Sequence, residues 1–343
     1  MTGPRATRLM FAGLAAMFVA MGPAHADLKA IESAAKNEKE VTWYVANLDA
    51  RNAEAAGRIF TAKYGIKVNI VRAPSQTIYQ RLAQDLAQGV ASADVISTAD
   101  VGNFIALKEK KALALYKPEN AAKLLPAFRD LDPEGYFYTT VASPLIIAYN
   151  KDKVKPADVP QSWADLTNPK WANRLAFGHP AYSGFAGNWA VQVTKLYGKE
   201  YLEKLEKLKP QVGRSLFDAV NLVTSGERLV APTPVGPIME RADKGNPVAI
   251  HYPSDGAILV STPGGVVANA PHPNAARLFM EFLLGPEFGE ILVKARYEAM
   301  RPDVKALPGV KSMSEVKVIR PTIEETTTGI PKVAELWRSV FGQ

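Results

Sequence analysis

Polar residues recur where a predicted strand gives way to a predicted helix. They are Asn47 with Asp49, Ser75 with Gln76, Thr98 with Asp100, and Tyr182 with Ser183 and Gly184. In open α/β sheets the turns at the carboxyl ends of the strands form the ligand crevice. Helix N-termini in these turns offer free N–H groups and a positive dipole end, which suits a small anionic ligand. For Ser183 and Gly184, a simple N-cap is the competing interpretation.

Arg214 is the cation that best matches such a ligand. It lies in Gly213-Arg214-Ser215, directly before a predicted helix over Phe217–Thr224. Its planar guanidinium can bind a carboxylate or phosphate at two points. A surface arginine that caps a loop is the alternative. Tyr182 is expected to contact the ligand, whereas Tyr44 is expected to pack in the core with its hydroxyl satisfied.

Motifs that would indicate an enzyme are absent from the sequence. There is no Gly-x-Ser-x-Gly elbow, no His-Glu-x-x-His, no Walker loop and no cysteine. The four histidines, His25, His179, His251 and His272, do not have metal-ligand spacing. We therefore expect no catalytic residue, no metal site and no cofactor. A secreted hydrolase that uses a bare pair of carboxylates is the remaining enzyme class.

The first 26 residues have the three parts of a secretory signal peptide. Arg5 and Arg8 precede a mostly apolar run over Leu9–Met21, and Ala24-His25-Ala26 supplies a small-x-small cleavage site. The apolar run is shorter than the ~20 residues that span a bilayer. The sequence thus predicts export to the periplasm with cleavage after Ala26. Without cysteine, the exported protein can form no disulfide.

Length and charge limit the remaining possibilities. Removing 26 of the 343 residues leaves 317, and with 47% hydrophobic residues such a chain can form two domains around cores of their own. The formal net charge is +7, but lysines and acids are interspersed, as in Lys108-Glu109-Lys110-Lys111. A basic stripe with interleaved aromatics is missing, which argues against a nucleic-acid partner.

The predicted elements alternate between strand and helix, which indicates an α/β fold with mixed, mainly parallel sheets. In the first third they are a helix at Leu28–Asn37, a strand at Val41–Ala46, a helix at Ala50–Tyr64, a strand at Lys67–Arg72, a helix at Gln76–Gln88 and a strand at Ala93–Ile96. Further on, strands are predicted at Leu145–Tyr149 and Arg174–Phe177, and a helix at Phe185–Tyr197.

Four segments, in this order, carry a resemblance to a known family. They are Lys63-Tyr64-Gly65-Ile66-Lys67-Val68, Ser92-Ala93-Asp94-Val95-Ile96, Pro160-Gln161-Ser162-Trp163-Ala164-Asp165-Leu166, and Ala275–Leu283 followed by Gly285-Pro286-Glu287-Phe288-Gly289. The chain resembles the extracellular solute-binding proteins of family 1, in the ferric-ion-binding branch of periplasmic binding proteins.

The resemblance implies a two-lobed, type II-like fold of sheets flanked by helices, with the ligand cleft at the hinge. Lobe 1 would comprise residues 27–139 and 254–295, and lobe 2 residues 140–253 and 296–343. The chain would cross near Thr139, near Ser254 and around Arg296. It also implies a receptor that closes on a small molecule, acts as a monomer and delivers its ligand to the membrane permease subunits of an ABC importer.

Together, the residues and the resemblance give a predicted ligand-binding set. It consists of Asn47, Ser75, Thr98, Asp100, Ser143, Tyr182, Ser183, Gly184, Arg214, Thr233 and Asp255. Arg214 occupies a family position that often touches ligand or a synergistic anion. Asp255 lies in a turn where family members place a ligand-proximal polar residue and where it could receive a ligand amine; an ordinary Ser-Asp-Gly turn would also explain it.

The sequence departs from the iron-binding members of that branch at their ligand positions. Those proteins use paired tyrosines with a histidine and a carboxylate, because hard oxygen ligands suit ferric ion. Here the tyrosine-pair segment reads Ala231-Pro232-Thr233-Pro234-Val235-Gly236, the histidine position falls in Asn47-Leu48-Asp49, and the glutamate position falls near Ala99. We expect a small organic anion, a phosphorylated or phosphonate compound first and a carboxylate second, with ferric ion as the alternative.

Overall fold

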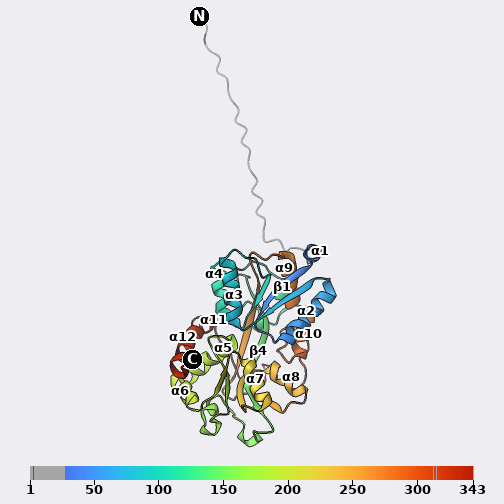
Figure 1. Ribbon diagram of the computed structural model, residues 1–343. Coiled ribbons are helices and arrows are strands. Elements are labelled where there is room, and N and C mark those ends of the chain that lie inside the picture. The colour runs from blue at the N-terminus through green and yellow to red at the C-terminus, as the bar shows by residue number, and fades with distance from the viewer. Residues whose placement is uncertain (1–2, 4–27, 312, 314, 343) are drawn as a thin grey trace.

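The computed structural model describes residue 3, residues 28–311, residue 313 and residues 315–342 (Figure 1). Apart from Gly3, the predicted signal peptide of Met1–Ala26 lies outside these residues. Two lobes are stacked in Figure 1, with α1 to α4 in the upper lobe and α5 to α8 in the lower. Within the described part of the chain, no helix is both long and apolar enough to cross a membrane.

Lobe 1, the upper lobe, is built on a parallel sheet in the order β2-β1-β3. Its strands are β1 (Glu40–Val45), β2 (Lys67–Arg72) and β3 (Val95–Ser97), and its helices are α1 (Leu28–Glu38), α2 (Ala50–Tyr64), α3 (Ser75–Ala87), α4 (Val101–Glu109), α9 (Pro273–Leu283) and α10 (Pro286–Lys294). Two short 3₁₀ turns, Glu119–Lys123 and Pro126–Phe128, follow α4.

Both faces of this sheet are covered, as the alternating direction of strand side chains requires. In β1, Trp43 points into the core below α9, where its ring centroid lies 5.2 Å from that of Phe279. The next residue, Tyr44, points to the opposite core, which contains Ile78 of α3 and Phe104 of α4. The Tyr44 hydroxyl donates to Asp85 Oδ2 at 3.1 Å, so the predicted core role of Tyr44 is confirmed.

Lobe 2 contains a second α/β layer with an aromatic core. Its strands are β5 (Ala176–Gly178), β6 (Gln211–Gly213), β7 (Val230–Pro234), β8 (Val248–His251) and β10 (Val318–Ile319), and its helices are α5 (Gly184–Tyr197), α6 (Lys199–Lys207), α7 (Leu216–Ser225), α8 (Val235–Asp243), α11 (Ile323–Thr327) and α12 (Gly329–Phe341). Three 3₁₀ turns lie at Pro156–Asp158, Ala164–Thr167 and Pro169–Trp171. Phe177 stacks on Trp189 of α5 and packs edge-on against Trp337 of α12, which ties the C-terminal helix to this lobe.

Two long strands connect the lobes: β4 (Tyr138–Asn150) and β9 (Ala257–Val266). β4 pairs first with β9 and then with β7 and β8, whereas β9 reaches β3 at its far end. Every antiparallel pair among the named strands involves β4 or β9, and β1–β2, β1–β3 and β5–β6 are parallel. The chain therefore has the two-lobed α/β fold expected, with parallel units inside the lobes and crossover strands between them.

The segment of the predicted third crossing, around Arg296, contacts both lobes. Tyr297 and Met300 are buried in the lobe 1 core with Phe279, whereas Val310 packs in the lobe 2 core. Arg296 itself pairs with Asp243 of α8 in lobe 2, so the crossing around Arg296 stays as we propose it. The boundaries near Thr139 and Ser254 stay as we propose them.

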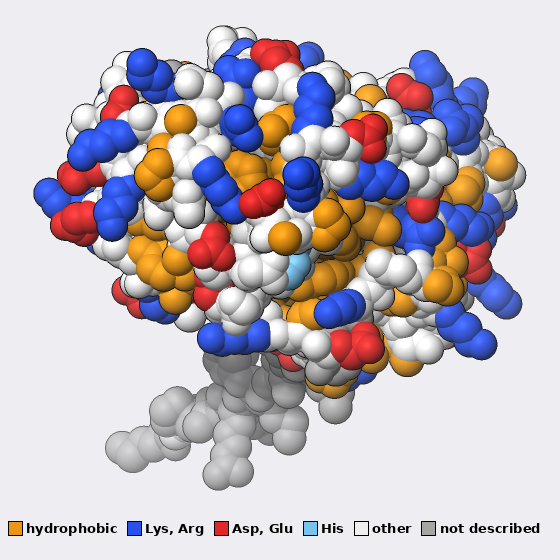
Figure 2. Space-filling model, turned by 90° about the horizontal axis from the view of Figure 1, so that it is seen from below, with side chains coloured by type: hydrophobic (Ala, Val, Ile, Leu, Met, Phe, Trp, Pro, Cys, Tyr) orange, Lys and Arg blue, Asp and Glu red, His pale blue; other side chains and the backbone are white. Residues whose placement is uncertain are grey.

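On one face of the molecule, charged side chains of both signs are interspersed. On the face seen from below, Figure 2 shows lysine and arginine side chains alternating with carboxylates around an apolar hollow. Such a surface lacks the continuous basic footprint with which proteins bind nucleic acid.

Candidate functional site

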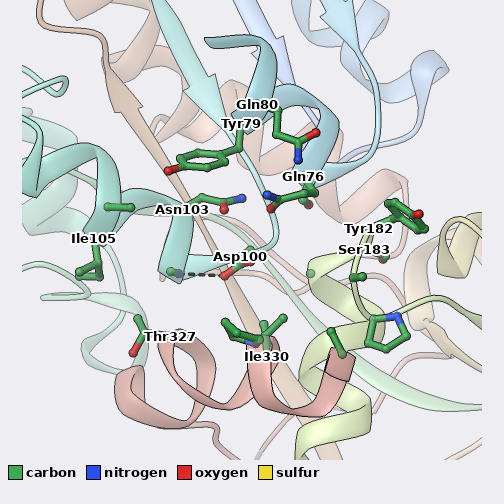
Figure 3. A pocket seen from close by; sticks show the side chains of 18 of the residues that line it. Gln76, Tyr79, Gln80, Asp100, Asn103, Ile105, Tyr182, Ser183, Thr327 and Ile330 are labelled. Atoms are coloured by element: carbon green, nitrogen blue, oxygen red, sulfur yellow. Dashed lines mark hydrogen bonds between the residues drawn. The ribbon is translucent and has the colours of Figure 1, made fainter. Parts of the chain in front are cut away.

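A cavity of about 650 Å³ opens between the two lobes (Figure 3), and we call it the α3–α4 pocket. Lobe 1 contributes α3 and one side of α4 over its whole length, and lobe 2 contributes the turn before α5, the end of α11 and part of α12. Five residues of the predicted ligand-binding set line it: Ser75, Asp100, Tyr182, Ser183 and Gly184. The fold thus brings predicted residues from both lobes to one cavity.

Asp100 is the half-buried carboxyl group of this pocket, whereas Glu109 and Glu335 are exposed. It caps α4, and its Oδ1 accepts a hydrogen bond from the backbone N–H of Gly102 at 2.8 Å. Burial raises the pKa of Asp100 to about 6, although backbone N–H groups of Gly102 and Asn103 lower it in part. Glu109, Glu335 and Arg338 lie around the same pocket, so its carboxylates outnumber its single cation.

Ser183 and Gly184 form the start of α5, at the contact between the lobes. Ser183 is an N-cap whose Oγ accepts from the N–H of Ala186 at 3.4 Å. A β-carbon on Gly184 would lie 2.4 Å from the carbonyl carbon and oxygen of Ala99 in lobe 1. Only glycine permits this approach. In the closed arrangement the lobe 1 backbone therefore covers the helix N-terminus that we expected to receive an anion.

The hydroxyls of Ser75 and Thr98 hold the loop beneath the pocket. Ser75 Oγ accepts from the N–H of Ala99 at 3.2 Å. Thr98 Oγ1 donates to the carbonyl of Asp100 and accepts from its N–H, at 3.1 and 3.2 Å. These bonds fix the position of Asp100, while direct ligand contact by Ser75 or Thr98 stays a prediction.

Three further predicted residues are buried and carry oxygens with no hydrogen-bond partner among the described residues. They are Asn47 Oδ1, Ser143 Oγ and Thr233 Oγ1. The amide nitrogen of Asn47 is satisfied, because it donates to Thr262 Oγ1 at 2.9 Å and to Thr140 Oγ1 at 3.3 Å. A buried oxygen without a partner costs stability, so such groups are candidates for ligand or water contact.

Arg214 and Asp255 lie outside the lining of the α3–α4 pocket, and each has partners of its own. The exposed guanidinium of Arg214 stacks 5.2 Å from the ring centroid of Tyr182, on the rim of the cleft. Arg214 does not line the α3–α4 pocket with Ser183 and Gly184, and its contact with a ligand stays a prediction. Asp255 Oδ2 accepts from the N–H of Trp163 at 2.7 Å and from the hydroxyl of Tyr197. The ordinary-turn interpretation of Asp255 fits these two bonds. Its other oxygen, Oδ1, is buried with no hydrogen-bond partner among the described residues, so contact of Asp255 with a ligand stays a prediction.

A second cavity between the lobes, of about 430 Å³, was missed by the sequence analysis. We call it the α7–α8 pocket; α2 and the end of β2 form its lobe 1 side, and α7 and α8 form its lobe 2 side. Four cations line it: Arg51, Arg72, Arg241 and Lys244. The available signal was the position of Arg72 at the carboxyl end of β2. Arg51 and Arg241 lie inside helices and Lys244 is the C-cap of α8, where no local pattern marks them.

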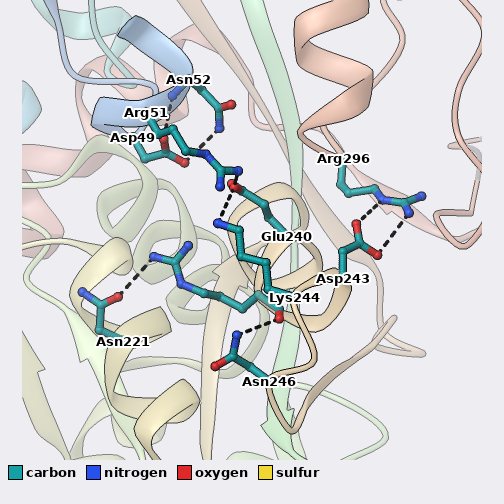
Figure 4. Close-up of polar contacts among 10 residues, drawn as sticks. Asp49, Arg51, Asn52, Asn221, Glu240, Asp243, Lys244, Asn246 and Arg296 are labelled. Atoms are coloured by element: carbon teal, nitrogen blue, oxygen red, sulfur yellow. Dashed lines mark hydrogen bonds and ion pairs between the residues drawn. The ribbon is translucent and has the colours of Figure 1, made fainter. Parts of the chain in front are cut away.

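The three carboxylates of the α7–α8 pocket, Asp49, Asp218 and Glu240, all have partners, and Figure 4 shows those of Asp49 and Glu240. Asp49 caps α2 and accepts from the backbone N–H and side-chain amide of Asn52, at 2.9 and 3.0 Å. Asp218 belongs to a capping box at the start of α7. Glu240 is buried and holds both Arg51, across the cleft, and Lys244, at 3.1 Å. Arg72 and Arg241 form no ion pair within the described part of the chain.

Tyr297 lies behind the α7–α8 pocket, and its hydroxyl has no partner among the described residues. Its side chain is buried against Gly236 at the start of α8. Burial raises the pKa of Tyr297 well above its usual value, the charge of Asp49 adds to that rise, and Arg72 acts against it. Because both charged residues line the pocket, the phenol is a neutral hydrogen-bond donor close to it.

Comparison with known proteins places this geometry in a family. Residues 91–319 match the family described as bacterial extracellular solute-binding protein. The chain is 25% identical over 256 residues to a putative 2-aminoethylphosphonate-binding periplasmic protein of Salmonella paratyphi A, covering 72% of this chain and 70% of that protein. It is 24% identical over 288 residues to the Fe(3+)-binding periplasmic protein of Serratia marcescens, covering 81% and 83%.

Solved structures share the fold. The periplasmic binding protein AfuA of Actinobacillus pleuropneumoniae, with fructose-6-phosphate bound, superposes with a TM-score of 0.80 at 20% identity, over 88% of this chain and 98% of that one. The family match covers two thirds of the sequence and includes the turn before α5, β7, and both crossover strands. The chain belongs to the bacterial extracellular solute-binding protein family.

Proposed function

We propose that this protein captures a small organic anion, a phosphorylated or phosphonate compound first and a carboxylate second, and that the α7–α8 pocket binds the anionic group. The broader role follows from family membership. The chain is a periplasmic solute-binding receptor of an ABC importer, with a small molecule and the permease subunits as its partners, and it is not an enzyme. We further propose that it acts as a monomer.

The charge arrangement of the α7–α8 pocket is the observation that carries the proposal. Two of its carboxylates, Asp49 and Asp218, accept hydrogen bonds from backbone N–H groups as helix caps. The third, Glu240, forms ion pairs with two cations. Arg72 keeps its two terminal nitrogens available, because only Nε is bonded, to the carbonyl of Leu48 at 2.8 Å. Within the described part of the chain, the guanidinium of Arg241 has a hydrogen bond to the amide oxygen of Asn221, at 3.5 Å, and no carboxylate partner. Two guanidinium groups without carboxylate partners supply the planar donors that bind phosphate or carboxylate.

The position of the pocket also supports binding coupled to closure. Arg72 comes from lobe 1 and Arg241 from lobe 2, so an anion held by both would join the lobes. The unpartnered phenol of Tyr297 adds a neutral donor close to them. Relatives named for 2-aminoethylphosphonate and a structural neighbour with fructose-6-phosphate bind anions of this class, which favours the proposal.

Ferric ion is the alternative, because relatives named for iron are equally similar. At the end of β7 this chain has Thr233 and Pro234 in place of a tyrosine pair, and Tyr182 stacks under Arg214. We expect weak iron binding for this reason. Tyrosinate coordinated to ferric ion gives visible colour. A coloured protein after iron loading, bleached by Tyr182→Phe, would favour iron over the anion.

Calorimetry with the purified protein tests the anion proposal. The probes are inorganic phosphate, a series of phosphonates and phosphorylated small molecules, and matched carboxylates. Arg72→Ala and Arg241→Ala should each weaken binding by roughly ten- to a hundredfold, since each removes charge-assisted hydrogen bonds worth ~1.5–3 kcal/mol. Arg72→Lys should recover part of the loss, because an ammonium keeps the charge but loses the fork.

The controls separate the pocket from the general surface charge. Arg58→Ala removes an exposed arginine of α2 outside both pockets and should leave affinity unchanged. Arg214→Ala tests the original prediction for the cleft rim, for which we expect a loss of the same size if the anion extends to Tyr182. Wild-type affinity in both Arg72→Ala and Arg241→Ala would overturn the assignment of the anion to this pocket.

A further inference from the structure

We propose that the α3–α4 pocket is a separate subsite for a neutral, polyhydroxylated solute, such as a monosaccharide ring or an alditol. This inference does not depend on the anion proposal, because it concerns a different cavity with a different set of side chains. It starts from Asn103 in the first turn of α4. Asn103 is 5% exposed, and its amide nitrogen has no hydrogen-bond partner among the described residues.

The unpartnered amide faces the cavity. Figure 3 shows the side chain of Asn103 directed into the pocket, toward Gln76 and Asp100 in this view. An amide donor buried without a partner costs about 1–3 kcal/mol, so it favours an acceptor atom supplied from outside the chain. Asp100, beside it, is an acceptor when ionised and holds only backbone N–H groups. The subsite therefore offers a donor and an acceptor together.

This pair of groups excludes two ligand classes and fits a third. A simple ammonium group could donate to Asp100 but has no lone pair to accept from Asn103. An anion could accept from Asn103 but would meet the carboxylates of Asp100, Glu109 and Glu335, against which the pocket holds only Arg338. A hydroxyl group both donates and accepts, so it satisfies both side chains at no cost in charge.

The rest of the lining suits several hydroxyls on one apolar frame. Gln76 and Gln80 on α3 add two carboxamides, each able to donate and accept. Tyr79 of lobe 1 provides a ring face against which the C–H surface of a sugar can pack. The cavity of about 650 Å³ lies in the range of small-molecule sites and exceeds what a single ion would fill.

Because both lobes contribute walls, occupation of this subsite should favour the closed arrangement. Gln76 already links the two lobes, because its backbone N–H donates a hydrogen bond to the carbonyl of Tyr182 at 3.4 Å. A solute bridging Asn103 and the turn before α5 would add to that bond.

The test uses the full mature protein and a panel of neutral solutes: glucose, fructose, mannitol and inositol, with phosphate and choline as charged comparators. Thermal shift identifies binders, and calorimetry measures their dissociation constants. At least one neutral solute should bind, and Asn103→Leu should weaken it by roughly tenfold or more. Leucine has nearly the shape of asparagine and removes the unpartnered amide, so the unliganded variant should melt no lower than the parent.

Two variants on α3 guard against a folding artefact. Gln80 lines the pocket and is exposed, and Gln80→Leu should also weaken binding of the neutral solute. Gln84→Leu lies one turn further along the same helix, is exposed and is outside the pocket, and it should bind as the parent does.

Three outcomes would overturn the proposal. No neutral solute binds a parent protein that does bind phosphate, in which case the anion proposal stands and this one fails. The second is that a neutral solute binds the parent and the Asn103→Leu variant with equal affinity. Choline binds with an affinity that depends on Asn103, which would make the subsite one for cations.

Discussion

Replacing Asp100 by asparagine should stabilise the protein at neutral pH and not at acid pH. Asp100 caps α4 through its bond to the N–H of Gly102. Asparagine is an equally good N-cap, so the substitution keeps the cap while removing the ionisable group. Any pH-dependent change in stability then reports the cost of burying the carboxylate.

The size of the effect follows from the pKa of Asp100, which burial raises from 3.8 to about 6. Between about pH 4 and pH 6 the folded protein keeps this proton and the unfolded chain loses it. The free energy of unfolding of the parent therefore falls as pH rises through this range. Two pKa units correspond to about 3 kcal/mol, which is the upper bound on the penalty that Asp100→Asn relieves above pH 6.

Urea unfolding, followed by tryptophan fluorescence from about pH 4 to about pH 8, measures the difference between variant and parent. The difference should be near zero at the acid end and grow to at most about 3 kcal/mol above pH 6. Asp49→Asn, at the cap of α2, is the matched control. A trend shared by both variants would come from the cap chemistry, and a difference for Asp100→Asn that is constant with pH would refute the reasoning.

The remaining predictions concern closure and export. Glu240→Gln removes the buried carboxylate that Arg51 contacts across the cleft. The variant should bind its ligand about tenfold more weakly, equivalent to about 1.4 kcal/mol, and small-angle scattering should show a more open apo protein. Unchanged scattering and affinity would contradict a role of Glu240 in closure. Gly184→Ala places a β-carbon against the backbone of Ala99. Overpacking of about 1–3 kcal/mol should lower ligand affinity about five- to a hundredfold while each lobe stays folded. Affinity equal to that of the parent in calorimetry would contradict this prediction. N-terminal sequencing of the periplasmic protein should begin at Asp27, and recovery of the intact N-terminus from the cytoplasm would disprove cleavage there.

Local sequence determined much of lobe 1. The predicted bounds of α2 and β2 agree with the structure, because Asp49 supplies an N-cap side chain and Gly65, with φ of 71°, ends the helix in the left-handed region. β1 and α3 shift by a residue at their ends. These features depend on residues within a few positions of each other, so they can be predicted from the chain alone.

Crossover strands were harder to predict, because their surroundings change along their length. Only Leu145–Tyr149 has the continuous apolar pattern of a buried strand, yet β4 begins at Tyr138. Its first half is hydroxylated and small, as in Thr139 and Thr140, and it is buried because β9 and lobe 1 cover it. Tertiary pairing overrides the weak local pattern there.

The sequence by itself determined that the chain is an α/β protein of the solute-binding type and which turns face the cleft, as Ser75, Asp100 and Tyr182 illustrate. Only the tertiary structure decided which side chains share a cavity and which are already used. Arg51 forms an ion pair with Glu240, and Asp255 accepts hydrogen bonds from Trp163 and Tyr197. Such partners lie far apart in the chain and meet through the docking of two lobes. Helix and strand periodicity encode the face on which a side chain lies, but not the group that it meets across a cleft.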